Sequence, residues 1–171
     1  MHLAELNISK WKINPDTDPV AREFIDNIER INALAERSDG FIWRLKDENR
    51  DERGRTPVGG PLVLITLSVW QDATRLEHFV WNTVHKRIYQ QKHKWFEIMD
   101  SHHFVMWHVE EGHRPTLEEA KERLDHLDQH GDSDFAFGWS YVKSHAVRRD
   151  GQDLAKKDRS HEKLWQQQRC A

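Results

Sequence analysis

The segment from Pro61 to Trp70 constrains the fold most strongly, because it is typical of a strand with two apolar faces. Two sets of side chains alternate along it: Val63, Ile65, Leu67 and Val69 on one face, and Leu62, Leu64, Thr66, Ser68 and Trp70 on the other. A strand of this kind lies inside a sheet with a layer on each side. Helices are expected to form one layer. The chain offers few candidates for the other layer, so we expect a second copy to supply it and predict a homodimer.

The other predicted elements follow from hydrophobic periodicity and from helix start and stop signals. In chain order they are a strand at 3–9, a helix from Asp18-Pro19 to about Arg37, a strand at 41–45, one long helix or two helices with a joint at 72–99, a strand at 103–109, a helix from the capping box Thr116–Glu119 to Gly131, and a strand at 135–141. The order predicts an α+β fold, with a ferredoxin-like antiparallel sheet and helices on one face. We expect one domain over residues 1–142 and a polar, flexible tail over 143–171. The charged stretch 46–60 is expected to be a solvated loop or a lid.

Composition excludes several classes of function. The net charge of -3 gives no electrostatic reason to expect nucleic acid as a partner. No run approaches the ~18 apolar residues of a membrane helix, and the N-terminus lacks the pattern of a secretory signal. The single cysteine, Cys170, excludes an internal disulfide. We therefore expect a cytoplasmic protein without a membrane partner.

The segment from Asp72 to Met99 is the predicted location of the functional site, because two stripes run along it at helical spacing. One stripe is apolar: Leu76, Val80, Val84, Ile88, Trp95 and Ile98. The neighbouring stripe is polar and aromatic: His78, Asn82, His85, Tyr89 and His93. A helix that packs its apolar stripe on a sheet holds the second stripe at the edge of the contact, where ligand pockets form.

His85 is the first candidate for chemistry, since it lies one helical turn from both Trp81 and Tyr89. A neutral imidazole here can act as a general base or ligate a metal or haem iron. The alternative is a structural histidine that is hydrogen-bonded where helix meets sheet. Trp81 and Tyr89 offer aromatic walls and Asn82 a hydrogen-bonding group for a small molecule. Trp70, at the end of the central strand, is expected to line the same pocket.

Asn7 and Glu5 are polar residues in the middle of the first predicted strand, where a buried side chain needs a partner. Facing a pocket, Asn7 would serve as an amide that orients a substrate. Alternatively, it faces water at a sheet edge or pairs across a dimer seam. The pair His126 and His130 has zinc-chelating spacing but lacks an evident third ligand, and histidines near a helix C-terminus are favoured by the helix dipole.

Four segments resemble the family described as domain of unknown function 3291. They are LAELNI at 3–8, FVWNTVHKRIY at 79–89, Trp95-Phe96, and GHRPTLEEA at 112–120. The resemblance covers residues 3–141 and implies a branch of the dimeric α/β-barrel superfamily, which includes antibiotic-biosynthesis monooxygenases and haem-degrading monooxygenases. In that fold two ferredoxin-like sheets pack face to face, and each pocket lies between sheet and helices.

The resemblance also implies site residues. The haem-degrading branch uses an asparagine on the first strand and a tryptophan and a histidine on the helix after the third strand; Asn7, Trp81, and either His85 or His93 are similar in kind. Cofactor-free members instead hold an aromatic substrate with such side chains. Three hypotheses follow: a monooxygenase-like enzyme acting on an apolar or aromatic molecule or binding haem, a non-catalytic module that binds or senses a small ligand, and a dimeric scaffold with a filled pocket.

Overall fold

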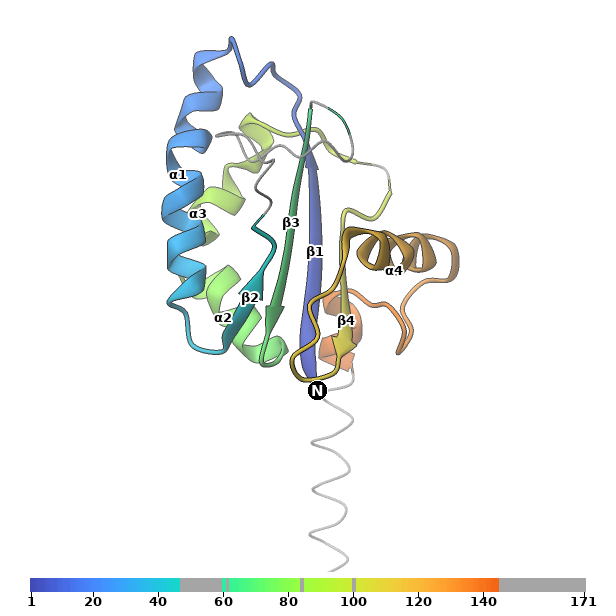
Figure 1. Cartoon of the computed structure of the whole chain (residues 1–171). Coiled ribbons are helices and arrows are strands. Elements are labelled where there is room, and N and C mark those ends of the chain that lie inside the picture. The colour runs from blue at the N-terminus through green and yellow to red at the C-terminus, as the bar shows by residue number, and fades with distance from the viewer. Residues whose placement is uncertain (47–59, 61, 84, 100, 145–171) are drawn as a thin grey trace, which may run out of the picture. The chain divides into compact units, whose positions relative to one another are not determined.

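Four antiparallel strands form one open sheet in the computed structural model, which describes residues 1–46, 60, 62–83, 85–99 and 101–144 (Figure 1). The elements are β1 (His2–Lys10), α1 (Pro19–Glu36), β2 (Phe41–Arg44), β3 (Val63–Trp70), α2 (Ala73–Asn82), α3 (His85–Gln90), the short 3-10 helix η1 (Lys92–Lys94), β4 (Phe104–Val109) and α4 (Leu117–His130). The strand order is β2-β3-β1-β4. This order confirms the α+β class and the ferredoxin-like arrangement of the strands, with β3 inside the sheet.

Helix starts follow the predicted capping residues. Asp18 accepts from the Val20 amide at 2.9 Å, Asp72 from the Arg75 amide at 3.0 Å, and Thr116 from the Glu119 amide at 3.2 Å. Each cap satisfies an amide that has no partner inside its helix. The second half of the predicted capping box is absent, because the Glu119 carboxylate instead accepts from the Trp107 indole at 2.8 Å and bonds to His113.

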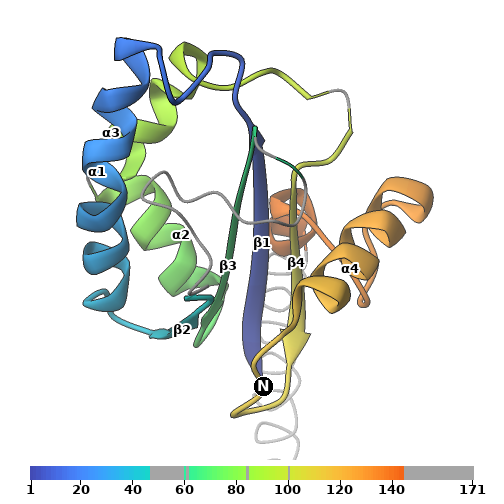
Figure 2. The same cartoon turned by 45° about the horizontal axis from the view of Figure 1, so that its top comes forward.

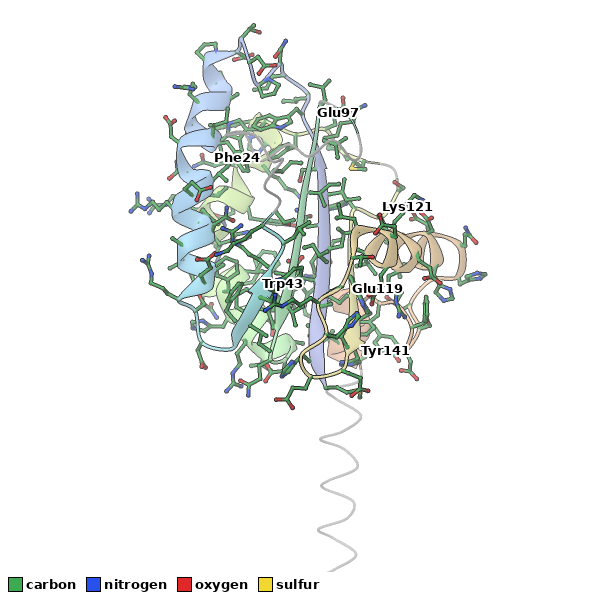
Figure 3. All side chains as sticks on the ribbon, in the orientation of Figure 1. Phe24, Trp43, Glu97, Glu119, Lys121 and Tyr141 are labelled. Atoms are coloured by element: carbon green, nitrogen blue, oxygen red, sulfur yellow. The ribbon has the colours of Figure 1, made fainter. Side chains whose placement is uncertain are left out.

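The two faces of the sheet have different covers (Figure 2). On one face, Ala4, Leu67 and Trp107 belong to a core that includes Ala120, Leu124 and Leu127 of α4. On the other face, Leu64 packs with Ala21 and Ile25 of α1 and with Trp95. Phe24 points from α1 into this second core, where its ring meets Trp11 edge-on at 5.4 Å (Figure 3). We call this second face the α1 face.

The prediction that all helices lie on one face is wrong for α4, which packs on β4 and β1 from the side opposite α1. Periodicity identified the buried stripe of α4, but such a stripe does not state which side of a sheet it covers. The half-buried residues Ile8, Trp43, Leu45 and Val63 pack at the margin of this core.

A regular strand at 41–45 would place Phe41 and Trp43 on one face, and residues 135–141 are predicted to form a strand. Both predictions need correction. A bulge between Phe41 and Trp43 turns these residues to opposite faces, with Phe41 against Trp70 and Trp43 in the α4 core. The predicted strand 135–141 is reduced to one bridge, Met106 with Phe137, and residues 139–144 are helical. The alternation of aromatic and small residues in 135–141 therefore belongs to a turn followed by a helix.

The segment 72–99 consists of two helices with a joint, as one of the two alternatives predicted. Thr83 is extended, with φ -119° and ψ -176°, and it ends α2. Ile98 is 94% exposed and is not part of the buried stripe, whereas Phe79 is buried there. Val84, the predicted loop apart from Lys46 and Gly60, and the predicted tail beyond Ser144 lie outside the described residues.

The chain divides into two compact units, Met1–Phe137 and Gly138–Ala171. All named strands and helices belong to the first unit. Within the described ranges, no helix combines the length and apolar character needed to cross a membrane.

Candidate functional site

A row of polar side chains crosses the α1 face of the sheet, where a helix-covered surface would ordinarily be apolar. Glu5 stands opposite Ser68 in the β1–β3 register, and the next pair on this face is Asn7 opposite Thr66. Glu5 and Ser68 are buried, whereas Asn7 and Thr66 are half-buried. The row therefore runs from an enclosed carboxyl to an open amide and hydroxyl. Uncompensated burial of polar groups is unfavourable, so such a row calls for internal partners or a ligand.

The enclosed half of the row is a directed hydrogen-bond relay. The Trp70 indole donates to the Ser68 hydroxyl at 2.9 Å, and that hydroxyl donates to Oε1 of Glu5. An indole N–H can only donate, so the Ser68 oxygen must accept from it and turn its own proton toward Glu5. Oε1 therefore accepts, and any proton on this carboxyl resides on Oε2.

Burial raises the pKa of Glu5 from 4.5 to about 7, and the hydrogen bond from Ser68 opposes that increase. Desolvation penalises the charged carboxylate, which explains the direction. At neutral pH the carboxyl is present in both protonation states, as a group that takes up and returns protons requires. The carboxyl belongs to one of the few polar side chains that are buried in the described part of the chain.

Aromatic rings cover the relay from the side of α2. The Trp70 ring stacks on Phe79 with centroids 5.1 Å apart and meets Phe41 edge-on at 5.3 Å. Trp70 is 1% exposed, and its indole donates to Ser68. Phe79 in turn contacts the ring of His85 at 4.9 Å.

His85 is half-buried at the start of α3. Its Nδ1 lies 3.3 Å from the Val80 carbonyl oxygen, and its amide donates to Thr83 Oγ1 at 3.2 Å. Burial lowers its pKa, with the Val80 hydrogen bond acting in the opposite direction, so the imidazole is neutral at pH 7. A neutral ring whose Nδ1 donates to a carbonyl offers Nε2 as the acceptor.

The other predicted site residues lie further outward. Trp81 is half-buried and meets the exposed Tyr89 edge-on at 5.0 Å, while Asn82 and His93 are exposed. His93 belongs to η1 and not to the helix of His85. The structure therefore groups Trp81 with Tyr89, places His85 against Phe79, and leaves His93 apart from both.

Two histidine–carboxylate pairs and one surface hollow lie elsewhere. His102 bonds Asp128 and His113 bonds Glu119 of α4, each at 2.7 Å (Figure 3). An open hollow of about 560 Å³ on α4 is lined by Glu118, Lys121, Glu122, Asp125, His126, Gln129, His130 and Phe135. Within the described part of the chain, no three His, Cys, Asp or Glu side chains gather as a metal site.

Ser68 and Thr66 are the members of the row that the sequence did not identify as site residues, and Ser68 is the one that bonds Glu5. Its only signal is a hydroxyl within a strongly apolar strand, and its partner Glu5 lies 63 residues away. The register between β1 and β3 is needed to see that the two meet.

Comparisons with known proteins identify the family of the chain. A family model described as Domain of unknown function (DUF3291) matches residues 2–152. Neither a curated protein nor a solved structure matches the chain.

Proposed function

The chain belongs to the family described as Domain of unknown function (DUF3291), and we propose that it is a small-molecule enzyme of monooxygenase-like type. Its substrate is an apolar or aromatic molecule with a polar head. The site lies on the α1 face of the sheet, beside Asn7, Thr66 and His85. The same proposal assigns the family to the dimeric α/β-barrel superfamily.

The observation that carries this proposal is the polar row on the α1 face. Two adjacent register pairs, Glu5 with Ser68 and Asn7 with Thr66, replace the apolar residues that would pack best under helices. A few convergent polar groups within apolar surroundings are the usual pattern of a ligand site.

Each group in the site has a chemical use. The Asn7 amide can donate and accept, so it can orient a carbonyl or hydroxyl of the substrate. His85, neutral through burial, is a candidate base. Trp81 and Tyr89 supply aromatic walls at the outer end of the helix pair. In a cofactor-free reaction, a substrate CH₂ group and O₂ give a carbonyl and water, with the electrons supplied by the substrate.

The test begins with binding and then measures oxygen. A panel of aromatic ketones and phenols is screened by thermal unfolding of wild-type protein, Asn7→Leu, and the control Gln129→Leu, which changes an exposed amide on α4. Ligands of the site should raise the melting temperature of wild type and Gln129→Leu and have little effect on Asn7→Leu. An oxygen electrode should then record O₂ consumption with at least one of them. Equal stabilisation of all three proteins would contradict the site.

The alternative function is a non-catalytic module that binds or senses the same class of ligand. The burial of Trp70 and Phe79 is consistent with this alternative, because rigid aromatic surroundings suit binding as well as reaction. Stabilisation that depends on Asn7, without any O₂ consumption, would select the module over the enzyme.

Haem binding is a second candidate, and the hydrogen bond of His85 favours it. Iron-ligating histidines commonly bond their other ring nitrogen to a carbonyl, as Nδ1 of His85 does to Val80. His93 lacks this arrangement within its exposed 3-10 turn. Haem, when bound, would supply redox chemistry at its iron.

Titration with hemin tests this candidate. A shifted Soret band should appear with wild type and with His93→Ala, and it should be lost in His85→Ala. The absence of a shift with wild type would remove the haem version and leave the cofactor-free one.

We also propose a homodimer that uses the sheet face shared with α4. Ile8, Trp43, Leu45 and Val63 are half-buried at the edge of that core and offer apolar contact for a second copy. Sedimentation equilibrium should give twice the monomer mass for wild type and the monomer mass for Trp43→Glu. Monomeric wild type would contradict the dimer.

A further inference from the structure

We propose that Glu5 is the proton-transfer residue of this site, and that the substrate class is a weak carbon or oxygen acid. Such a compound carries a C–H or O–H made acidic by an adjacent carbonyl or aromatic ring. The inference rests on the proposed function and assigns its site a reacting group.

The relay dictates which atom reacts. The Trp70 indole can only donate, so the Ser68 hydroxyl must donate to Oε1, and Oε1 is committed as an acceptor. Oε2 is left as the atom that exchanges a proton with a ligand. Glu5 is buried, and the next residue on the same face of β1, Asn7, is half-buried. A ligand held by Asn7 and Thr66 is therefore one register pair away from the carboxyl.

The proton balance of the step is simple. The Glu5 carboxylate takes the acidic proton of the substrate through Oε2 and becomes a carboxylic acid. The electron pair of the broken bond stays on the substrate as an enolate or phenolate. The carboxylic acid later returns its proton to the product or to water, and Ser68 keeps its own proton throughout.

The surroundings favour Glu5 for this role over its neighbours. Its pKa is raised to about 7 by burial and lowered in part by Ser68, without any contribution from a charged neighbour. Of the histidines on α2, α3, η1 and β4, His78 on α2 and His93 on η1 are exposed. His85 on α3 bonds the Val80 carbonyl, and His108 on β4 is exposed beside Phe137. An isolated carboxyl with a pKa near the working pH suits general acid–base catalysis.

Nitrobenzisoxazole is a suitable probe, because it is a small aromatic carbon acid with a visible product. A base removes its ring C–H proton, the C–H electron pair forms a nitrile, the N–O bond breaks, and coloured cyanonitrophenolate is released. Wild type should catalyse this elimination with saturation, and the rate should rise with pH to a plateau with a midpoint near 7. Glu5→Gln, which keeps the acceptor for Ser68, should lower the rate on the order of 100-fold.

Matched variants separate the reacting group from its support. Glu111→Gln changes an exposed carboxyl and should leave the rate unchanged. Ser68→Ala should keep activity and move the midpoint to higher pH, because the Ser68 hydrogen bond lowers the Glu5 pKa. An unchanged midpoint in Ser68→Ala would overturn the role of the relay.

Binding is measured separately with nitroindazole, a stable analogue that lacks the N–O bond, by quenching of tryptophan fluorescence. Binding to wild type and Glu5→Gln, with turnover only in wild type, supports the proposal. Binding to both with no turnover, or with equal turnover, overturns the role of Glu5 and leaves the binding site intact. Failure of the analogue to bind wild type overturns both this inference and the proposed site.

Discussion

Ser68 stands directly opposite Glu5 on neighbouring strands, and its hydroxyl donates a hydrogen bond to the Glu5 carboxyl. The same hydroxyl accepts from the Trp70 indole, so its orientation is not free. A sheet face under helices thus contains a carboxyl whose protonation is coupled to the packing of a buried tryptophan. Because of this coupling, the effect of the Glu5–Ser68 hydrogen bond can be measured through the stability of the protein as well as through its activity.

The stability of the protein should depend on pH through Glu5. In the unfolded chain this carboxyl ionises near pH 4.5, and in the folded protein it does so at about 7. Between these values the folded state binds more protons, so the free energy of unfolding decreases as pH rises and levels off above about 7. The total decrease is roughly 3 kcal/mol.

Urea unfolding of wild type and Glu5→Gln, at intervals from pH 4.5 to 8, measures this dependence. The variant should gain stability relative to wild type as pH rises, and the control Glu111→Gln should not. A constant difference between Glu5→Gln and wild type would show that the folded carboxyl ionises normally.

Loss of the Ser68 hydroxyl should lower the free energy of unfolding substantially. Ser68→Ala leaves the buried Trp70 N–H and Glu5 without their shared partner, at about 2–4 kcal/mol for two unsatisfied groups. Thr66→Val removes a hydroxyl from the neighbouring, half-buried position and should cost less than about 1 kcal/mol. Chemical denaturation compares the two, and equal effects would argue against the relay.

Local signals were sufficient for most elements of the fold. Asp18, Asp72 and Thr116 mark helix starts through their own side chains, and the alternation of residues 63–70 marks a central strand. Each of these signals depends only on residues close together in the chain, so it can be recognised in the sequence alone. The face covered by α4, the bulge at Phe41–Trp43 and the single bridge of Phe137 depend on contacts between distant segments.

The same distinction applies to the site. Asn7 and Glu5 were visible as polar residues inside a strand, and His85 as a histidine among aromatic residues. The sequence could not pair Glu5 with Ser68, because that requires the strand register. The sequence also could not show that Trp70 is buried between Phe41 and Phe79, whereas Trp81 is only half-buried.

Glu119 should stabilise the protein more through the hydrogen bond that it accepts from Trp107 than through its negative charge. Its carboxylate accepts from the buried Trp107 indole at 2.8 Å and pairs with the half-exposed His113. Glu119→Gln keeps an acceptor for Trp107 and should cost less than about 1 kcal/mol, as expected for a partly solvated ion pair. Glu119→Leu removes that acceptor and should cost about 1–3 kcal/mol more. Thermal unfolding of the two variants separates these effects, and similar losses would contradict the importance of the Trp107 bond.

Two glycines with positive φ should respond differently to alanine. The φ angle is 77° at Gly40 and 73° at Gly131, a range that other residues rarely adopt, so alanine is strained at either position by on the order of 1–3 kcal/mol. At Gly131 a new Cβ would meet open space, whereas at Gly40 it would lie 2.1 Å from Cγ and 2.7 Å from Cβ of Arg75. The Gly40 carbonyl also accepts from the Gln71 amide at 2.7 Å, which holds this turn against the start of α2. Gly40→Ala should therefore destabilise the protein by at least about 2 kcal/mol more than Gly131→Ala, as measured by urea unfolding at one pH. Adding Arg75→Ala should recover part of that difference, and equal losses for the two glycines would show that the turn and α2 are not in close contact.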